Sequence, residues 1–313
     1  MNQQENSLQF KIVLAFAAIY VIWGTTYLAI ALSIQTLPPF ASGGIRFVIA
    51  ALLVFAGLRA RHSRPFEGID MKRAAISGAT LTGLGNGLVI WAQQGLPSGI
   101  AALIVAVIPI IVLLVEILFF SGKLPTARAA LGMSVALLGV ITIVIHTHDL
   151  SGSAQPIYVA AILCAVVSWS FGTVFQRRAC VPSQRIMAFT CAQMFFGGLL
   201  QLSLATISGE WRHFNLAMIS FTSIGALLYL VVFGSIIALS SYTWLLTKMP
   251  AQKVATYALV NPVVALVLGA FVLNEKITVT AVLAALGVLI GIALVLFPSG
   301  GLKWKLWRQS EAT

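Results

Sequence analysis

The sequence predicts an all-α polytopic membrane protein, with ten transmembrane helices in two inverted five-helix repeats around a central cavity. Hydrophobic residues make up 59% of the 313 positions and charged residues only 9%, and the mean hydropathy is +0.99. The apolar residues fall in continuous runs of about 20, the length that crosses a bilayer as a helix. A soluble domain carries about 25% charged residues, and a membrane β-barrel shows alternating segments of about 10 residues. Both of these classes are therefore excluded.

Proline, glycine and charged residues divide the chain into ten apolar runs. The connections between them are short, which predicts that consecutive helices pack as antiparallel neighbours. Residues 1–10 lack the basic region of a signal peptide, so the first run is expected to remain in the mature protein. The expected spans are residues 12–32, 39–58, 74–93, 98–120, 125–145, 156–176, 185–207, 219–246, 251–273 and 277–297.

The distribution of basic residues predicts the orientation. Placing the N-terminus in the cytoplasm puts sixteen of the nineteen lysines and arginines on the cytoplasmic side. Arg212 and Lys276 then lie outside, and Arg46 falls within the second span. Because short cytoplasmic loops are enriched in basic residues, both termini are expected to be cytoplasmic.

The net charge of +11 does not indicate a nucleic-acid partner, because the basic residues lie between apolar runs and form no single stripe. Cys164, Cys180 and Cys191 have no metal-ligand spacing and are expected to be free thiols. The expected partners are the lipid bilayer and a small-molecule substrate, with the chain acting as a monomer or a homodimer. No cofactor and no metal are expected.

An internal repeat divides the chain into residues 1–147 and 148–313. Trp23-Gly24-Thr25 and Phe171-Gly172-Thr173 correspond at an offset of 148 residues. Because each half has five helices, an odd number, the second half must be inverted relative to the first. Inverted repeats with a site at the bilayer midplane are typical of secondary transporters. At an offset of 153 residues, Pro97, Pro109 and Lys123 correspond to Pro250, Pro262 and Lys276.

Two of these prolines are candidate hinges. Pro109 and Pro262 fall near the centres of the fourth and ninth spans, where a proline cannot donate to the carbonyl four residues back. The carbonyls of Val105 and Ala258 then lack that partner. Neighbouring helices can satisfy such a kink, or the broken backbone can line a polar cavity. The matched positions favour a cavity beside at least one of them.

Several motifs together resemble the EamA family of bacterial drug/metabolite transporters. The resemblance covers essentially all of residues 12–297. The motifs are Ile22-Trp23-Gly24-Thr25-Thr26-Tyr27, Gly44-Ile45-Arg46-Phe47, Pro97-Ser98-Gly99-Ile100-Ala101-Ala102, Ser168-Trp169-Ser170-Phe171-Gly172 and Thr256-Tyr257-Ala258-Leu259-Val260-Asn261-Pro262.

The resemblance implies a multi-pass protein of the bacterial cytoplasmic membrane that exports small metabolites such as amino acids. Helices one, three, four, six, eight and nine would line the cavity, and helices five and ten would lie at the periphery. The family's Gly-Glu-Lys/Arg element is present in the second half as Asn274-Glu275-Lys276. The first half has Ser121-Gly122-Lys123 and lacks the carboxylate.

Polar and aromatic residues on several helix faces are the candidate substrate-binding groups. Aromatic walls with a few oriented dipoles suit a small amphipathic solute. The carbonyls freed by the two prolines could receive an ammonium group, and asparagine amides could receive a carboxylate without a buried charge. The candidates are Trp23, Tyr27, Asn86, Trp169, Tyr257 and Asn261.

Two charged residues lie inside spans, where a charge costs at least about 2.5 to 3.5 kcal/mol. Arg46 is seven residues past the start of the second span, roughly 10 Å deep at 1.5 Å per residue. It is either an anchor for a carboxylate or a structural donor to nearby carbonyls. Glu116, near the end of the fourth span, is either a proton carrier for coupling or a carboxylate that snorkels or pairs with lysine.

Other function classes fit the sequence less well. An importer or an efflux carrier for drugs and other cationic compounds has the same architecture and stays an alternative. An intramembrane enzyme is a remote alternative, since no HExxH or GxSxG motif and no pair of membrane aspartates occurs. His146, His148 and Asp149 could hold a metal, but a solvated loop is the simpler interpretation. A channel would require rings of charges or carbonyls.

Overall fold

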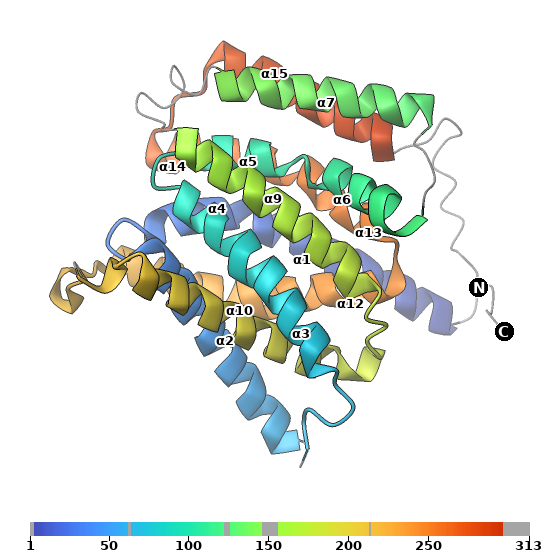
Figure 1. Ribbon diagram of the computed structural model, residues 1–313, viewed down its shortest axis with the longest axis vertical. Helices are drawn as coiled ribbons and strands as arrows, with labels where there is room; N and C mark the ends of the chain where they lie inside the picture. The colour runs from blue at the N-terminus through green and yellow to red at the C-terminus, as the bar shows by residue number, and fades with distance from the viewer. Residues whose placement is uncertain (1–2, 62–63, 122–125, 146–155, 213, 297–313) are drawn as a thin grey trace.

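The computed structural model describes residues 3–61, 64–121, 126–145, 156–212 and 214–296, and the regular structure within these ranges is entirely helical (Figure 1). Within these ranges, eight helices are long and apolar enough to cross a membrane, and two shorter apolar helices cover Ala127–Ile143 and Val279–Val295. The ten predicted spans are therefore all present. The first helix begins nine residues before its predicted start, and the other boundaries differ by a few residues. The candidate metal ligands at positions 146, 148 and 149 and the repeat boundary at 147/148 lie outside the described residues.

Six of the spans are essentially single helices. The first and second are α1 (Gln3–Ser33) and α2 (Pro39–Arg61), and the seventh is α10 (Ile186–Ile207), preceded by the short η3 (Ser183–Arg185). The fifth and tenth are α7 (Ala127–Ile145) and α15 (Val279–Leu296). The sixth, α9 (Pro156–Arg177), is likewise unbroken.

The other four spans change their helical geometry along the way. The third comprises α3 (Met71–Ser77), the π-helix η1 (Gly78–Gly85) and α4 (Asn86–Ala92). The fourth comprises α5 (Ser98–Val105), α6 (Ile108–Glu116) and the π-helix η2 (Ile117–Ser121). The eighth comprises α11 (Phe221–Tyr229), the π-helix η6 (Leu230–Leu239) and α12 (Ser240–Lys248). The ninth comprises α13 (Ala251–Val254), the 3₁₀ helix η7 (Ala255–Leu259) and α14 (Asn261–Leu273).

These irregular segments occupy matching places in the two halves. The third helix of each half contains a long π-helix, and the fourth helix of each half is interrupted before a proline. Pro109 and Pro262 lie in the first turns of α6 and α14, where the missing proline N–H leaves no intrahelical bond unmade. The sequence analysis left two alternatives at these prolines, a kinked helix or a broken backbone beside a cavity. The structure breaks each helix in two before its proline.

Helices α7 and α15 pack against each other at one side of the molecule, at the top of Figure 1. Their interface is built from small residues. A Cβ added to Gly291 would lie 2.4 Å from the Ala136 nitrogen, and one added to Gly132 would lie 2.6 Å from the Gly291 carbonyl oxygen. Close backbone approach of this kind is a common way for helices to associate in a bilayer. The pair thus has the peripheral position that the resemblance implied.

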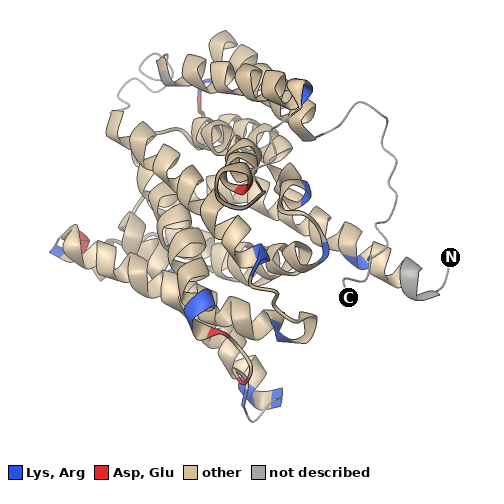
Figure 2. Cartoon of the chain, turned by 45° about the vertical axis from the view of Figure 1, so that its right-hand side comes forward, with Lys and Arg blue, Asp and Glu red and all other residues tan. Residues whose placement is uncertain are grey.

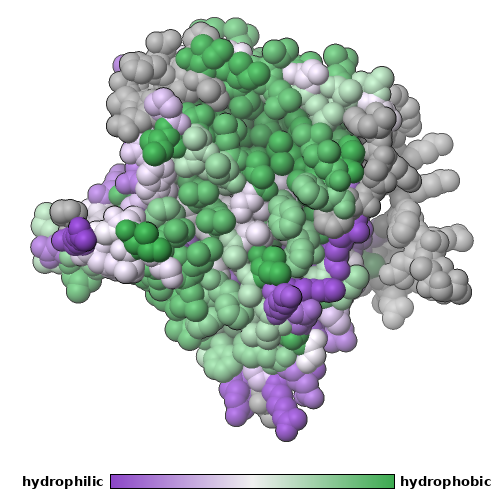
Figure 3. Space-filling model, in the orientation of Figure 1, coloured by the Kyte–Doolittle hydropathy of each residue, from purple (hydrophilic) through white to green (hydrophobic). Residues whose placement is uncertain are grey.

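The surface is that of a protein surrounded by lipid. Figure 2 shows that charged residues are sparse along the helices and lie mostly at their ends. On the face drawn in Figure 3, apolar residues cover most of the molecule and hydrophilic residues gather at its margins. We call one end of the bundle the basic end, because it carries Arg59 and Arg61 of α2, Arg177 of α9 and Lys248 of α12.

Candidate functional site

A central cavity lies where the irregular helices meet. Its free volume is about 60 Å³, room for a few water molecules. Residues from the first, second, third, fourth, sixth, eighth and ninth spans line it. They are Trp23, Thr26, Tyr27, Arg46, Phe47, Thr82, Gly85, Asn86, Val89, Val105, Ile108, Ala165, Val166, Trp169, Gly234, Leu239, Tyr257 and Asn261.

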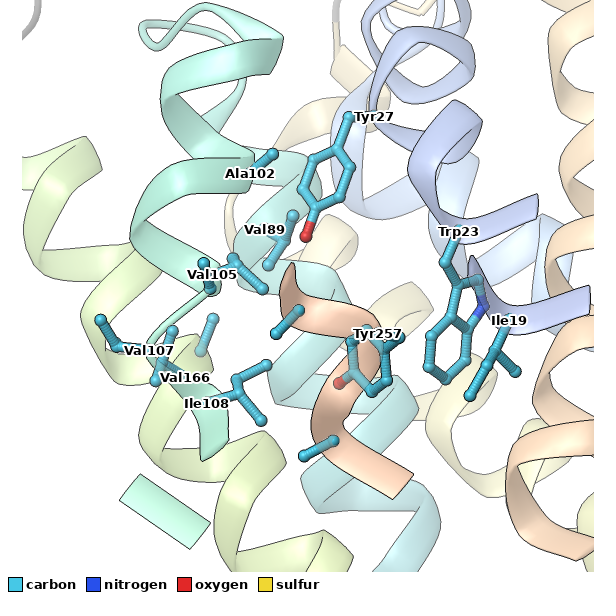
Figure 4. Packing of buried hydrophobic residues seen from close by; sticks show 14 of the residues in the cluster. Ile19, Trp23, Tyr27, Val89, Ala102, Val105, Val107, Ile108, Val166 and Tyr257 are labelled. Carbon is cyan, nitrogen blue, oxygen red and sulfur yellow. The ribbon is translucent and has the colours of Figure 1, made fainter. Parts of the chain in front are cut away.

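The structure brings all six predicted substrate-binding residues to this one cavity. Arg46 lies there too, although its helix was not among the six expected to line the cavity, so the second span is an addition to that set. Glu116 does not reach it. Figure 4 shows Tyr27 directed from α1 toward Val89 and Val105, with Ile108 and Val166 nearby.

Four aromatic rings pack together beside the central cavity, and we call them the aromatic cluster: Trp23, Trp169, Tyr242 and Tyr257. The Trp23 ring centroid lies 4.9 Å from that of Tyr257 and 5.0 Å from that of Tyr242. Trp169 is 5.5 Å from Trp23 and 5.7 Å from Tyr242. Edge-to-face and tilted pairs at such distances are favourable beyond their buried area. The four rings come from four different spans.

Hydrogen bonds fix the cluster to its neighbours. The Trp23 indole N–H donates to the Gly234 carbonyl at 3.3 Å, which connects α1 to η6. The hydroxyls of Tyr242 and Thr173 are 2.5 Å apart, connecting α12 to α9. The buried indole N–H of Trp169 interacts with the hydroxyls of Tyr242 and Tyr257, although it makes no bond of full hydrogen-bond geometry in the described part of the chain.

Arg46 is a buried cation. Its side chain is 2% exposed, its Nε donates to Ser235 Oγ at 2.7 Å, and its Nη1 lies 3.5 Å from Asn86 Oδ1. The guanidinium also sits 4.7 Å from the centre of the Phe47 ring. No carboxylate among the described residues forms an ion pair with it. These contacts of Arg46 are all with side chains at the cavity. They differ from the carbonyl contacts that a purely structural donor was expected to make.

The two asparagines differ from each other. The side-chain oxygen of Asn86 accepts from Arg46, and its amide nitrogen is not the atom that contacts the guanidinium. With the amide of Asn261 oriented to satisfy both neighbours, its nitrogen donates to the carbonyls of Tyr257 and Tyr20 at 3.2 Å each. Asn261 thus spans the break in the ninth span and connects it to α1. The amide donor that we expected to receive a substrate carboxylate is engaged in this structure.

Glu116 lies at a second cavity of about 630 Å³ near the basic end, together with Arg177 and Arg178. Its Oε2 accepts a hydrogen bond from Gln252 Nε2 at 2.9 Å. The second cavity was not predicted from the sequence, because its walls combine the fourth, sixth and eighth spans with the connection after the sixth, segments that only the fold brings together.

Two further carboxylates cap helices at the end opposite the basic end. Glu275 accepts from the backbone N–H groups of Ser98 at 2.7 Å and Gly99 at 3.2 Å, at the start of α5. Glu210 accepts from those of Phe40 and Ala41 at 3.1 and 2.9 Å, at the start of α2. The free N–H groups of a helix start favour a carboxylate there. Glu275 belongs to the expected family element, whereas nothing in the sequence singled out Glu210.

Broken helices and π-helices in matching places of the two halves, around a central cavity, are the architecture of a membrane transporter. The EamA-like transporter family matches residues 10–145 and 156–297. The chain therefore belongs to the EamA-like transporter family. It is a transporter and not an enzyme, and among the described residues no three His, Cys, Asp or Glu side chains are grouped to hold a metal.

Related proteins extend over nearly the whole chain. YedA of Escherichia coli K12, named an uncharacterized inner membrane transporter, is 34% identical, covering 91% of this chain and 90% of its own length. PagO of Salmonella typhimurium LT2 is 26% identical, with 91% and 93% covered. A protein of Escherichia coli K12 named as a probable amino-acid metabolite efflux pump is 25% identical, with 92% and 94% covered. One solved structure shares the fold, with a TM-score of 0.62 at 19% identity, over 90% of this chain and 95% of its own.

Proposed function

We propose that this transporter exports small carboxylate-bearing amphipathic metabolites, amino acids or related compounds, by alternating access across a bacterial inner membrane. The observation that carries the proposal is Arg46, the only charged residue among the described residues that line the central cavity. A buried guanidinium without a carboxylate partner is unfavourable, and it binds carboxylates well. A substrate carboxylate would supply the missing counter-charge.

The walls around Arg46 suit the remainder of such a substrate. The aromatic cluster and Val105, Ile108 and Val166 offer apolar surface. The Trp169 indole N–H, beside the hydroxyls of Tyr242 and Tyr257, adds polar groups to this wall. Trp23, Tyr27 and Tyr257 would contact the apolar part, and Asn86 and Asn261 would hold the polar surroundings in place. An apolar amino acid presents this combination of groups.

The small volume of the central cavity implies movement. Ligand sites usually have about 300–1,000 Å³, several times the 60 Å³ seen here. The substrate therefore binds after the surrounding helices separate. The breaks before Pro109 and Pro262 would act as the hinges, since a half-helix can tilt there without losing an intrahelical bond.

The proposed orientation rests on the distribution of basic residues. Because cytoplasmic loops are enriched in lysine and arginine, the basic end would face the cytoplasm and both termini would be cytoplasmic. Two relatives, one named as an inner membrane transporter and one as a probable efflux pump, support an inner-membrane location and the outward direction. A carrier for cationic compounds that lack a carboxylate is disfavoured, because such a compound would bring no counter-charge to Arg46 and no described residue that lines the central cavity is acidic. An importer would use the same site.

Export can be tested in a strain that accumulates an amino acid to toxic levels. Expression of the wild-type chain should restore growth and lower the intracellular amino-acid concentration, whereas an Arg46→Gln variant of equal expression should not. Resistance to cationic dyes without any effect on amino acids would contradict the proposal and indicate a cation carrier. A rise in the intracellular concentration would indicate import.

A further inference from the structure

The second cavity has the size and the walls of a ligand site. Its volume of about 630 Å³ lies within the usual range for small-molecule sites. It opens among the ends of α9 and α12, the connection between α9 and α10, and the end of α6. Its lining residues are Glu116, Val174, Gln176, Arg177, Arg178, Cys180, Val181, Pro182, Ser183, Thr243, Leu246 and Thr247. We call it the basic-end cavity.

Both signs of charge are held on its walls. Arg177 Nη1 donates to the carbonyl of Leu246 at 3.1 Å and to that of Met249, so its guanidinium is fixed at the last turn of α12. Arg178 follows it in the chain. Glu116 is held from the other side by Gln252. Glu116 also interacts electrostatically with Arg177 and Arg178. A ligand with one positive and one negative group can therefore bind between these opposite charges and meet a complementary charge on each side.

A buried amide adds a polar group to the same wall. Gln176 is 3% exposed and lines the basic-end cavity. Its oxygen accepts from Gln193 Nε2 at 3.1 Å, but its own Nε2 has no partner within the described residues. Leaving a buried N–H unsatisfied is unfavourable, so an oxygen atom of a ligand would be favoured beside it.

We propose that the basic-end cavity is a second substrate site that holds a zwitterionic amino acid before it reaches the central cavity. Arg177, Arg178 and the Gln176 amide receive the carboxylate, and Glu116 receives the ammonium group. This choice of ligand rests on the proposed function. The two cavities differ in kind, because the central one offers a cation alone.

The two sites are separated by a thin layer. Tyr242 is fully buried and bonded to Thr173, and its ring contacts Trp23 and Trp169. Thr173 lies one turn before Gln176 on α9, and Tyr242 directly precedes Thr243 on α12. A substrate in the basic-end cavity is thus about one helical turn from the aromatic cluster, which must move aside for it to pass.

A native thiol in the basic-end cavity provides a direct test. Cys180 lines it, so replacing Cys164 and Cys191 by serine leaves one reporter. The rate at which a membrane-impermeant maleimide labels Cys180 in the purified, folded protein is measured with millimolar L-leucine, L-leucinamide or 4-methylpentanoate. Leucine should slow labelling at least fivefold. Leucinamide, which lacks the carboxylate, and 4-methylpentanoate, which lacks the ammonium group, should each protect much less.

Variants separate this site from the central one. Arg178→Gln and Glu116→Gln should each lose most of the protection by leucine, while the exposed control Arg212→Gln and the central-site variant Arg46→Gln should keep it. Thermal unfolding identifies any variant that is misfolded. If the variants do not fold, the second site is still tested by comparing the protection that the three probes give in the reporter protein, which needs neither charge substitution.

Absence of protection by leucine, or equal protection by all three probes, would overturn the second site even if leucine is transported. Protection without any transport would support the second site and contradict the proposed function. If Glu116→Gln keeps full protection but removes the pH dependence of transport, Glu116 is a coupling residue and its assignment to the ammonium group is overturned.

Discussion

At the scale of single residues, the central cavity is defined by aromatic rings and one cation. Tyr257 is almost fully buried, contacts Trp23 and Tyr242 through its ring, and lines the cavity. Its ring belongs to η7, the 3₁₀ segment just before the break in the ninth span. The ring can therefore contact the apolar part of a ligand, and it also packs against the other aromatic rings when the central cavity is as small as it is in this structure.

Tyr257→Ala should weaken substrate binding by about 1.5 to 3 kcal/mol, the effect of losing a large apolar contact. Tyr257→Phe, which keeps the ring, is the matched control and should bind within a few-fold of wild type. Equilibrium binding of radiolabelled substrate to purified protein measures both. Wild-type affinity in a well-folded Tyr257→Ala protein would place the site elsewhere.

Glu210 should make stability depend on pH. Burial raises the pKa of this carboxyl above its ordinary value of 4.5, and the backbone bonds from Phe40 and Ala41 lower it by less. A carboxyl with a raised pKa binds its proton more tightly in the folded state. Its contribution to stability is present below the unfolded pKa and is lost as pH rises through the folded pKa.

The apparent Tm of wild type should therefore fall relative to that of Glu210→Gln as pH rises from about 4 to about 7, the range just above an ordinary glutamate pKa. Unfolding scans at one fixed heating rate, on protein in the same detergent, provide the comparison. A Tm difference that stays constant, or one that grows in favour of wild type with rising pH, would contradict this account of Glu210.

Seven of the eighteen residues that line the central cavity could be predicted from the sequence, because polar and aromatic side chains are unusual within apolar spans. The importance of Tyr242 and Ser235 could not be predicted in this way. Their importance depends on which helix faces meet, and that is decided by packing between distant segments. Glu210 was missed for the same reason, since the helix start that it caps lies 169 or more residues earlier.

At the scale of elements, the proline positions predicted where the fourth and ninth spans are interrupted. The π-helices in the third and eighth spans were not predicted. They contain no proline. A π-helix differs from an α-helix in that its backbone hydrogen bonds join residues five apart and not four apart, and this difference does not change the hydropathy pattern that predicts a span. Each contributes residues to the central cavity, Thr82 and Gly85 from η1 and Gly234 and Leu239 from η6.

The α7–α15 pair provides a matched test of close helix packing. A Cβ at Gly291 would lie 2.4 Å from the Ala136 nitrogen, whereas at Gly287 the nearest atom, the Gly139 Cα, is 3.7 Å away. Gly291→Ala should destabilise the protein by about 1 to 3 kcal/mol through overpacking. Gly287→Ala should be neutral or stabilising by up to about 1 kcal/mol, from helix propensity.

The apparent Tm of the two variants measures this difference. Substrate affinity should be unchanged in both, because no residue of α7 or α15 lines the central cavity. Equal Tm values for Gly287→Ala and Gly291→Ala would show that the pair is loosely packed. A change in affinity at constant Tm would show that α15 communicates with the site.

At the scale of the whole molecule, the basic end should face the cytoplasm. Fusions of a C-terminal fluorescent protein, which matures in the cytoplasm, and of alkaline phosphatase, which is active only outside it, report the location of the C-terminus. We expect fluorescence and no phosphatase activity. The reverse result would invert the molecule, and the basic-end cavity would then face outward.

The central claim is that the substrate carboxylate binds Arg46 in the central cavity during transport. The most direct test is counterflow of radiolabelled L-leucine in proteoliposomes containing wild type, Arg46→Gln or the exposed control Arg212→Gln. Wild type and Arg212→Gln should show saturable counterflow that 4-methylpentanoate inhibits far better than leucinamide. Arg46→Gln should lose at least about tenfold in transport efficiency, since a hydrogen bond to a charged group contributes about 1.5 to 3 kcal/mol. Wild-type counterflow by Arg46→Gln, or equal inhibition by leucinamide and 4-methylpentanoate, would contradict the claim.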